Sequence, residues 1–255
     1  MIENIWEGIY DSFDQCPGHG QGYESDRWVR QETERIHSLL QAIKNDGAIP
    51  SVVSYRMNLL PLLAATTAVN SKKNKVTILD FGGGLGSTYI SVTAACANSQ
   101  IVDYHIVESK SICRAGKECF KGNTHIHFYD HLPEKIQDVD IVCLCSSIQY
   151  IKDWQGLLKG VAEYDPQYVL LADVPAGDIP TYATVQNYYE SKIPYWFFDV
   201  NEIIRMMSSI KFELLFRSSC ACTYLGKEQP MPQANFPAEY RVGNSCNLLF
   251  NRAQE

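Results

Sequence analysis

Val76-Thr77-Ile78-Leu79-Asp80-Phe81-Gly82-Gly83-Gly84-Leu85-Gly86 is the stretch that decides the fold. A β-branched and apolar run leads into an acid and a glycine-rich loop, and residues 87–95 after the loop have the pattern of a helix. The order strand, glycine loop, helix directs backbone N–H groups and the positive end of a helix dipole toward a ligand. Glycine suits such a loop because a Cβ would block the close approach of that ligand.

The spacing of the glycines indicates which kind of ligand the loop takes. A dinucleotide loop of the G-x-G-x-x-G kind is disfavoured, because Ser87 stands where the third glycine would be, counted from Gly82. The order is instead acid-x-G-x-G-x-G, formed by Asp80, Gly82, Gly84 and Gly86. This order resembles motif I of the class I S-adenosylmethionine (SAM) methyltransferases. The resemblance implies SAM as the cofactor and a methyltransferase activity, with a glycine-rich turn of another α/β protein or a nicotinamide oxidoreductase as alternatives.

The composition is that of an ordinary globular chain of 255 residues, with 45% hydrophobic and 20% charged residues. A net charge of −7 argues against a surface that tracks nucleic-acid phosphates. No apolar run approaches the ~20 residues that cross a bilayer, and the first residues lack the pattern of a signal peptide. We therefore expect a cytoplasmic protein with no nucleic-acid partner and no membrane span. Its oligomeric state is open, with a homodimer as one possibility.

Cysteines and histidines give no pattern typical of a metal site. The chain has nine cysteines, an odd number, and none of them forms a C-x-x-C pair. Two alternating pairs are expected to be small buried hydrophobes on strand faces, namely Cys143, Cys145, Cys220 and Cys222. The cluster of His125, His127 and His131 lacks matched ligands at zinc spacing, and His125 and His127 are expected at the solvent or the core edge. We therefore expect no metal.

Strand and helix patterns alternate through the middle of the chain. Five strands are predicted, at residues 76–80, 102–108, 126–129, 140–145 and 168–173, with helices that include 111–120 and 154–164. Such alternation predicts a doubly wound parallel sheet, although the link 129–140 is too short and polar for a helix. Two late strands, 212–217 and 246–250, predict an antiparallel end of the kind that the resemblance implies. The expected fold is therefore α/β, Rossmann-like, with a mostly parallel seven-stranded sheet.

The segments around this core predict a two-part organisation. Residues 1–70 are expected to form an N-terminal helical and aromatic cap or lid, with 1–25 as an ordered loop and helices at 26–45 and 52–69. Residues 71–255 are expected to form the SAM-binding domain. Within it, the aromatic segment 175–207 is predicted to cover the acceptor side.

Polar residues follow the predicted strands, where ligands bind in open α/β sheets. Glu108 ends the second strand, and its two carboxylate oxygens can accept hydrogen bonds from both hydroxyls of a ribose. Asp130 follows the third strand and could accept from an adenine amino group, and Ser146 follows the fourth, beside the expected methyl-transfer cavity. The predicted cofactor-binding residues are thus Asp80, Gly82, Gly84, Gly86, Glu108, Asp130 and Ser146.

Methyl transfer from a sulfonium is an in-line displacement that mostly needs positioning and a dry cavity. A base near the proton of a hydroxyl acceptor would add about 10²–10⁴-fold to the rate. The candidates for that base are, in order, His131, Asp173 and Tyr150. Each of them has loop capping as its alternative role.

A narrower resemblance runs over almost the whole chain. It rests on the glycine loop and on Trp6-x-Gly8-x-Tyr10, Gly22-Tyr23, Val107-Glu108, Gly116-Lys117, Ser146-Ser147-Ile148-Gln149-Tyr150 and Pro194-Tyr195-Trp196. These motifs are similar to those of a family of bacterial proteins named as methyltransferases by analogy, whose genes typically lie among those for lipopolysaccharide and capsule assembly. The resemblance implies methylation of a surface sugar or its nucleotide-linked precursor. The alternatives are a methyltransferase of another, flatter small molecule and a non-catalytic SAM-binding relative that scaffolds a partner.

Overall fold

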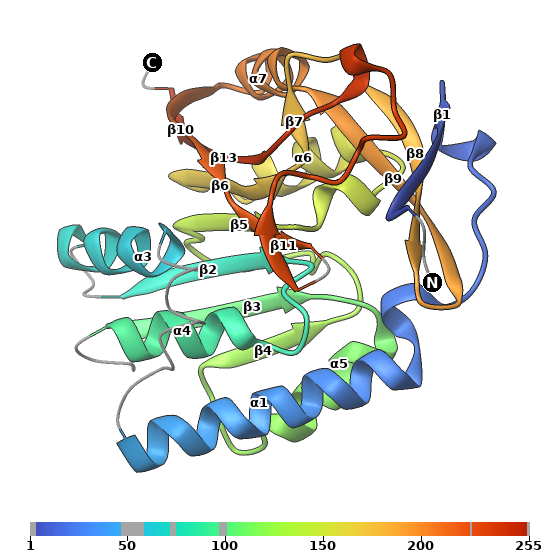
Figure 1. Cartoon of the computed structure of the whole chain (residues 1–255). Helices are drawn as coiled ribbons and strands as arrows, with labels where there is room; N and C mark the ends of the chain where they lie inside the picture. The colour runs from blue at the N-terminus through green and yellow to red at the C-terminus, as the bar shows by residue number, and fades with distance from the viewer. Residues whose placement is uncertain (1–3, 47–58, 72–74, 97–100, 225, 254–255) are drawn as a thin grey trace. The chain divides into compact units, whose positions relative to one another are not determined.

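The computed structural model describes residues 4–46, 59–71, 75–96, 101–224 and 226–253 (Figure 1). The chain forms two compact units. The first, here called the glycine-loop unit, comprises Tyr23–Leu144 and Tyr164–Tyr168. The second, here called the aromatic unit, comprises Met1–Gly22, Cys145–Glu163 and Val169–Glu255. The predicted boundary between a cap and a SAM-binding domain at residue 70 stays a prediction.

The main sheet has seven strands in the order β10-β13-β6-β5-β2-β3-β4. β2 pairs in parallel with both β3 and β5, β3 pairs in parallel with β4, and β10 pairs antiparallel with β13. The bounds are β2 Val76–Phe81, β3 Val102–Val107, β4 Ile126–Tyr129, β5 Ile141–Cys145, β6 Tyr168–Val174, β10 Phe212–Cys220 and β13 Ser245–Arg252. The predicted α/β fold with a mostly parallel seven-stranded sheet is therefore confirmed.

Helices pack around the first strands of the glycine-loop unit. Strand β2 is buried over its first five residues, as expected for a parallel strand whose two faces are both covered. The helices are α1 (Asp26–Asp46), α3 (Leu59–Asn70), α4 (Ser87–Ala95) and α5 (Lys110–Cys119). The long helix α1 packs against α5 and α4, and α3 packs against α4 and β2 (Figure 1).

The structure describes part of the helix predicted at 52–69 and all of the link between β4 and β5. Of the helix expected at 52–69, residues 52–58 lie outside the described part, and α3 begins at Leu59. Pro61 is the third residue of α3 within the described range. The link between β4 and β5 contains no helix, as its short polar sequence predicts.

The aromatic unit contains a second sheet that was not predicted from the sequence. Its four strands have the order β1-β8-β9-β7. Their bounds are β1 Trp6–Tyr10, β7 Ala176–Gly177, β8 Tyr182–Tyr188 and β9 Ser191–Asp199. The expectation of a loop over residues 1–25 is therefore wrong at Trp6–Tyr10, which pairs antiparallel with β8. The segment 175–207 holds β7, β8, β9 and most of the next helix, α7 (Val200–Ser209).

Aromatic side chains form the core of this second unit. Trp6 is buried, with its ring centroid 5.5 Å from that of Phe197, and Phe197 stacks on Tyr182 at 5.2 Å. Tyr195 and Phe236 belong to the same buried cluster. Large aromatic rings bury much apolar area each, so a few of them suffice to hold a small sheet. The unit also includes α6 (Trp154–Ala162), β11 (Cys222–Tyr224) and β12 (Lys227–Gln229). No helix in the described ranges is long and apolar enough to cross a membrane.

Candidate functional site

The glycine loop follows β2 and leads directly into α4. Gly86 is the residue before the helix and has φ +92°, a conformation that side chains rarely adopt. A Cβ on Gly86 would also lie 2.9 Å from the Phe120 ring and 3.0 Å from Ile126. A Cβ on Gly83 would lie 2.5 Å from Oδ2 of Asp80. The loop therefore lies close against the carboxyl group below it, and only glycine fits there.

Asp80 is fully buried beneath this loop. Its Oδ2 accepts a hydrogen bond of 2.7 Å from the Tyr104 hydroxyl, whereas Oδ1 has no hydrogen-bond partner among the described residues. Burial raises the pKa of Asp80 to about 7, against the opposing effect of the Tyr104 hydrogen bond. A buried acceptor without a donor is costly. An N–H or ammonium group of a ligand would satisfy it.

Glu108 follows β3 and is hydrogen-bonded to the glycine loop. Its Oε1 accepts from the Gly84 amide at 3.1 Å, and its Oε2 accepts from the Ser109 amide at 3.0 Å. Burial raises the pKa of Glu108, although these two backbone hydrogen bonds oppose the shift. A carboxylate oxygen can accept more than one hydrogen bond. Glu108 can therefore bind a pair of neighbouring hydroxyls while it remains bonded to the loop.

The start of α1 lies next to the same loop, which the sequence reading did not predict. The Trp28 ring would be 3.7 Å from a Cβ built on Gly84, and Tyr23 contacts Trp28 edge to face at 5.8 Å. An indole face beside a glycine loop offers an apolar surface for a flat or aliphatic part of a ligand. The motif Gly22-Tyr23 is a sequence signal that could have pointed to this contact.

Asp130 and His131 follow β4 as a pair. Nδ1 of His131 lies 2.7 Å from Oδ1 of Asp130, and the hydrogen bond to His131 lowers the pKa of Asp130. The His131 side chain is 76% exposed. The neighbouring carboxylate orients the imidazole ring. Both residues belong to the glycine-loop unit, together with Asp80 and Glu108.

Ser146 and Asp173 both belong to the aromatic unit and lie at the carboxyl ends of the neighbouring strands β5 and β6. The Ser146 amide donates to the carbonyl of Ala172 at 2.8 Å, which places Ser146 beside the end of β6. Both Ser146 and Asp173 have φ +52°, a strained conformation for residues other than glycine. Such strain is often found at functional sites. The two residues, predicted separately as a cofactor contact and a candidate base, therefore lie at neighbouring strand ends, and their roles stay predictions.

Asp173 also contacts a pair of cysteines. The Cys222 thiol donates to Oδ1 of Asp173 at 3.0 Å, and Sγ of Cys220 lies 3.8 Å from Sγ of Cys222. The pKa of Cys222 is raised, first by its interaction with Cys220 and then by burial and the nearby Asp173 carboxylate. The two cysteines are half-buried rather than fully buried, and they belong to β10 and β11 rather than to one strand. The expectation of small buried hydrophobes on a single strand face is wrong for this pair.

Tyr150, the third candidate base, has a partner of its own. Its hydroxyl donates to Oε1 of Gln186 at 2.9 Å, and its ring packs edge to face on Tyr195 at 5.2 Å. Tyr150 and Asp173 belong to the aromatic unit, and His131 belongs to the glycine-loop unit. Each of the three predicted bases therefore has a defined position, and the role of each stays a prediction.

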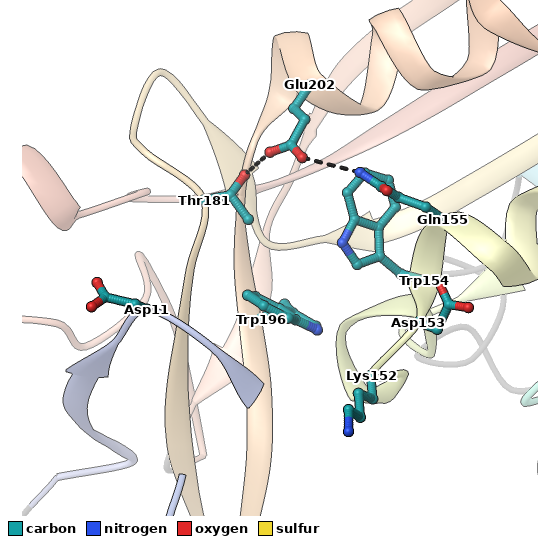
Figure 2. Close-up of a pocket in the computed structure, with 8 residues that line it drawn as sticks. All are labelled: Asp11, Lys152, Asp153, Trp154, Gln155, Thr181, Trp196 and Glu202. Atoms are coloured by element: carbon teal, nitrogen blue, oxygen red, sulfur yellow. Dashed lines mark hydrogen bonds between the residues drawn. The ribbon is translucent and has the colours of Figure 1, made fainter. Parts of the chain in front are cut away.

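The aromatic unit contains a pocket of about 340 Å³ (Figure 2). Two indoles, three carboxylates, one ammonium and two smaller polar side chains line it, from Asp11, Lys152, Asp153, Trp154, Gln155, Thr181, Trp196 and Glu202. Glu202 accepts hydrogen bonds from Thr181 and Gln155, and Nε1 of Trp196 donates to the Ile151 carbonyl at 3.2 Å. These contacts fix the lining. None of these eight is among the predicted site residues, although Thr181, Trp196 and Glu202 lie in the segment 175–207 that was predicted to cover the acceptor side.

Comparisons with known proteins give a match at the level of structure. No protein-family model matches the chain, and no curated protein is detectably similar to it in sequence. Magnesium protoporphyrin IX methyltransferase from Synechocystis PCC 6803, solved with bound SAH, is 13% identical, with a TM-score of 0.54 over 91% of this chain and 96% of that one. The chain has a methyltransferase fold.

Other methyltransferase structures agree. The 1,6-didemethyltoxoflavin-N1-methyltransferase of Burkholderia thailandensis, solved with S-adenosylhomocysteine, is 10% identical, with a TM-score of 0.51 and 92% of each chain covered. A SAM-dependent methyltransferase from Clostridium acetobutylicum ATCC 824 is 11% identical, with a TM-score of 0.52 over 88% of this chain and 100% of that one. At such low identities the likeness shows the methyltransferase fold alone.

Proposed function

We propose that the protein is a SAM-dependent methyltransferase. The observation that carries this proposal is the pair of carboxylates around the glycine loop, of which Asp80 has an unpartnered buried oxygen and Glu108 is bonded to the loop amide. SAM has an α-ammonium group and a ribose diol, which are the donors that these two acceptors need. Neighbours with this fold are crystallised with SAM or its demethylated product, which supports the same choice.

Different residues of the glycine-loop unit would contact different parts of the cofactor. The loop of Gly82, Gly84 and Gly86 would lie against the methionine part, with Asp80 as acceptor for its ammonium group. Glu108 would accept from the ribose hydroxyls, and Asp130, which is exposed, from the adenine amino group. When bound, SAM supplies the methyl group as a cationic electrophile. Ser146 stays a predicted cofactor contact within the aromatic unit.

The chain's own part in the reaction would be to position the acceptor and to hold its proton. His131 is oriented by Asp130, so its second ring nitrogen could take the proton of a hydroxyl. Asp173 is an alternative base, with a strained backbone and a carboxylate that already accepts from Cys222. Tyr150 is the third. A pH profile of kcat for variants of each would assign the base.

For the acceptor we propose a sugar or another small polar molecule, in line with a role in surface polysaccharide synthesis. The pocket of Figure 2 supports this choice, because carboxylates accept from hydroxyls and an indole face can contact the C–H face of a sugar ring. Its three carboxylates outnumber the single ammonium of Lys152. A nucleotide-linked acceptor would therefore place its sugar, and not its phosphates, in this pocket. A flatter acceptor is the alternative, since neighbours act on a porphyrin and a toxoflavin precursor.

Calorimetric titration with SAM and S-adenosylhomocysteine tests the cofactor assignment. We expect micromolar binding that Glu108→Gln weakens by roughly 10–100-fold, the loss of about one charged hydrogen bond at 1.5–3 kcal/mol. Glu118→Gln is the matched control, because its side chain on α5 is 78% exposed. Equal affinity in both variants would contradict the ribose assignment. Binding of SAM without its conversion to S-adenosylhomocysteine in the presence of any sugar acceptor would favour the non-catalytic alternative.

A further inference from the structure

Three metal-ligating side chains come together on β3 and β4, away from the proposed cofactor residues. Asp103 and His105 are two residues apart on β3 and so share a face, and His127 of β4 is in register with His105. Oδ1 of Asp103 lies 3.0 Å from Nε2 of His127 and 3.5 Å from Nε2 of His105. One ligand atom from each residue lies within 4.8 Å of the other two. The two imidazole rings stack with centroids 4.7 Å apart and an interplanar angle of 22°. One cation can therefore bind all three residues once the histidine rings rotate so that both nitrogen lone pairs point at it.

His105 carries the observation that points to a ligand. Its side chain is only 9% exposed, and its buried Nε2 has no hydrogen-bond partner in the described part of the chain. Its other ring nitrogen, Nδ1, lies 3.1 Å from the Tyr129 hydroxyl. When Nδ1 donates its proton to that hydroxyl, Nε2 presents a lone pair toward Asp103. A buried acceptor of this kind is costly unless something binds it.

The carboxylate of Asp103 is oriented so that one oxygen remains for the cluster. Nζ of Lys75 lies 2.8 Å from Oδ2, whereas both histidines lie near Oδ1. Lys75 adds a positive charge nearby, but its side chain is 46% exposed and screened by solvent. Hydrogen bonds that orient metal ligands from outside are typical of protein metal sites. Lys75 and Tyr129 are placed to provide them here.

We propose that Asp103, His105 and His127 bind a divalent transition-metal ion, for which Zn²⁺ is the best match. Two imidazoles and a carboxylate suit zinc, whereas Ca²⁺ and Mg²⁺ take oxygen ligands. The ion would replace the direct contact between Asp103 and His127 and would accept water as its fourth ligand. It would satisfy the buried nitrogen of His105.

The position in the sheet places the ion where it would stabilise the pairing of two strands, although its fourth, water-filled position is of the kind that catalytic zinc sites keep open. Asp103 and His127 are each the second residue of their strands. Glu108 follows five residues after Asp103, which is about 16 Å along an extended chain. β4 is the last strand of the sheet order, so the ion would hold this edge strand to β3.

Zinc titration of the full, reduced chain against a chromogenic chelator tests the proposal. We expect one tight site that His127→Gln weakens at least tenfold, and that His37→Gln on the exposed face of α1 leaves unchanged. His127 suits substitution because its side chain is 37% exposed. Zinc should also raise the melting temperature of the wild-type chain and of His37→Gln, but not that of His127→Gln.

Two further measurements test whether zinc binds at Asp103, His105 and His127 or elsewhere. The cluster of Asp173, Cys220 and Cys222 is the alternative zinc site. If zinc binds Asp103, His105 and His127, as proposed, Cys220→Ser should retain the tight site. Loss of that site in Cys220→Ser, with retention in His127→Gln, would overturn the assignment. NMR of the imidazole nitrogens should show Nε2 of both His105 and His127 shifting on addition of zinc. Unmoved ring nitrogens at saturating zinc would overturn it as well.

Discussion

Asp80 links the glycine loop to the pH dependence of stability. Burial raises its pKa to about 7, whereas the pKa of an unfolded aspartate is about 3.9. Between these values the native state binds more protons than the unfolded state, so the free energy of unfolding must fall as pH rises. The expected slope is about 1.4 kcal/mol per pH unit at most.

Asp80→Asn removes this titration and keeps an acceptor for the Tyr104 hydroxyl. We expect the free energy of unfolding of the wild-type chain to fall between about pH 4 and pH 7 because of this carboxyl group. The variant should not show that fall. Urea denaturation at pH 5, 6 and 7 measures it. Asp14→Asn is the control, because the Asp14 side chain is 71% exposed. Parallel pH profiles of wild type and Asp80→Asn would show that the buried carboxyl does not retain its proton.

At the scale of elements, the junction of loop and α4 depends on Gly86. Gly86→Ala introduces a Cβ at φ +92° and within 3.0 Å of Phe120 and Ile126, so we expect a loss of about 2–4 kcal/mol. Gly122→Ala is the matched control, because Gly122 has φ +85° with no atom within 4 Å of the added Cβ. It carries the backbone strain alone, for which we expect about 1–2 kcal/mol. Equal losses in urea denaturation would mean that the contact with Phe120 relaxes freely.

The strands of the main sheet could be predicted because each is a short β-branched or apolar run with clear ends. The hairpin of β8 and β9 could not, for a physical reason. Its two-residue turn is Tyr189-Glu190, and Tyr189 itself adopts φ +52°. Hairpin prediction depends on glycine or asparagine at such positions, and here neither is present. An aromatic-rich segment without a visible turn is therefore easily taken for a loop or cover.

Across the whole molecule, how well a site can be predicted depends on what brings its residues together. Asp80 and Glu108 are adjacent to strand ends, and parallel strands bring such ends to one edge, so their positions follow from sequence order. The zinc cluster and the pocket of Figure 2 depend on register and on contacts between distant segments. His127 is visible in the sequence, but its partner His105 is set by the pairing of β3 with β4. No spacing rule along the chain contains that information.

Cofactor and acceptor binding should respond to different substitutions, because the loop and the pocket belong to different units. Asp11 lines the pocket and is exposed, so Asp11→Asn removes one acceptor for sugar hydroxyls at little cost to stability. We expect a rise in the KM for a hydroxyl-rich acceptor of roughly tenfold, with the Kd for SAM unchanged.

Asp178→Asn, an exposed acid of the same unit outside the pocket lining, is the matched control. Release of S-adenosylhomocysteine over a series of acceptor concentrations gives the KM of each variant. A rise in KM confined to Asp11→Asn assigns the acceptor to the pocket, because both substitutions remove the same charge from the unit. An unchanged KM in Asp11→Asn would place the acceptor elsewhere. A fall in KM would indicate an acceptor with anionic groups in the pocket, since removal of a carboxylate relieves the repulsion of a phosphate.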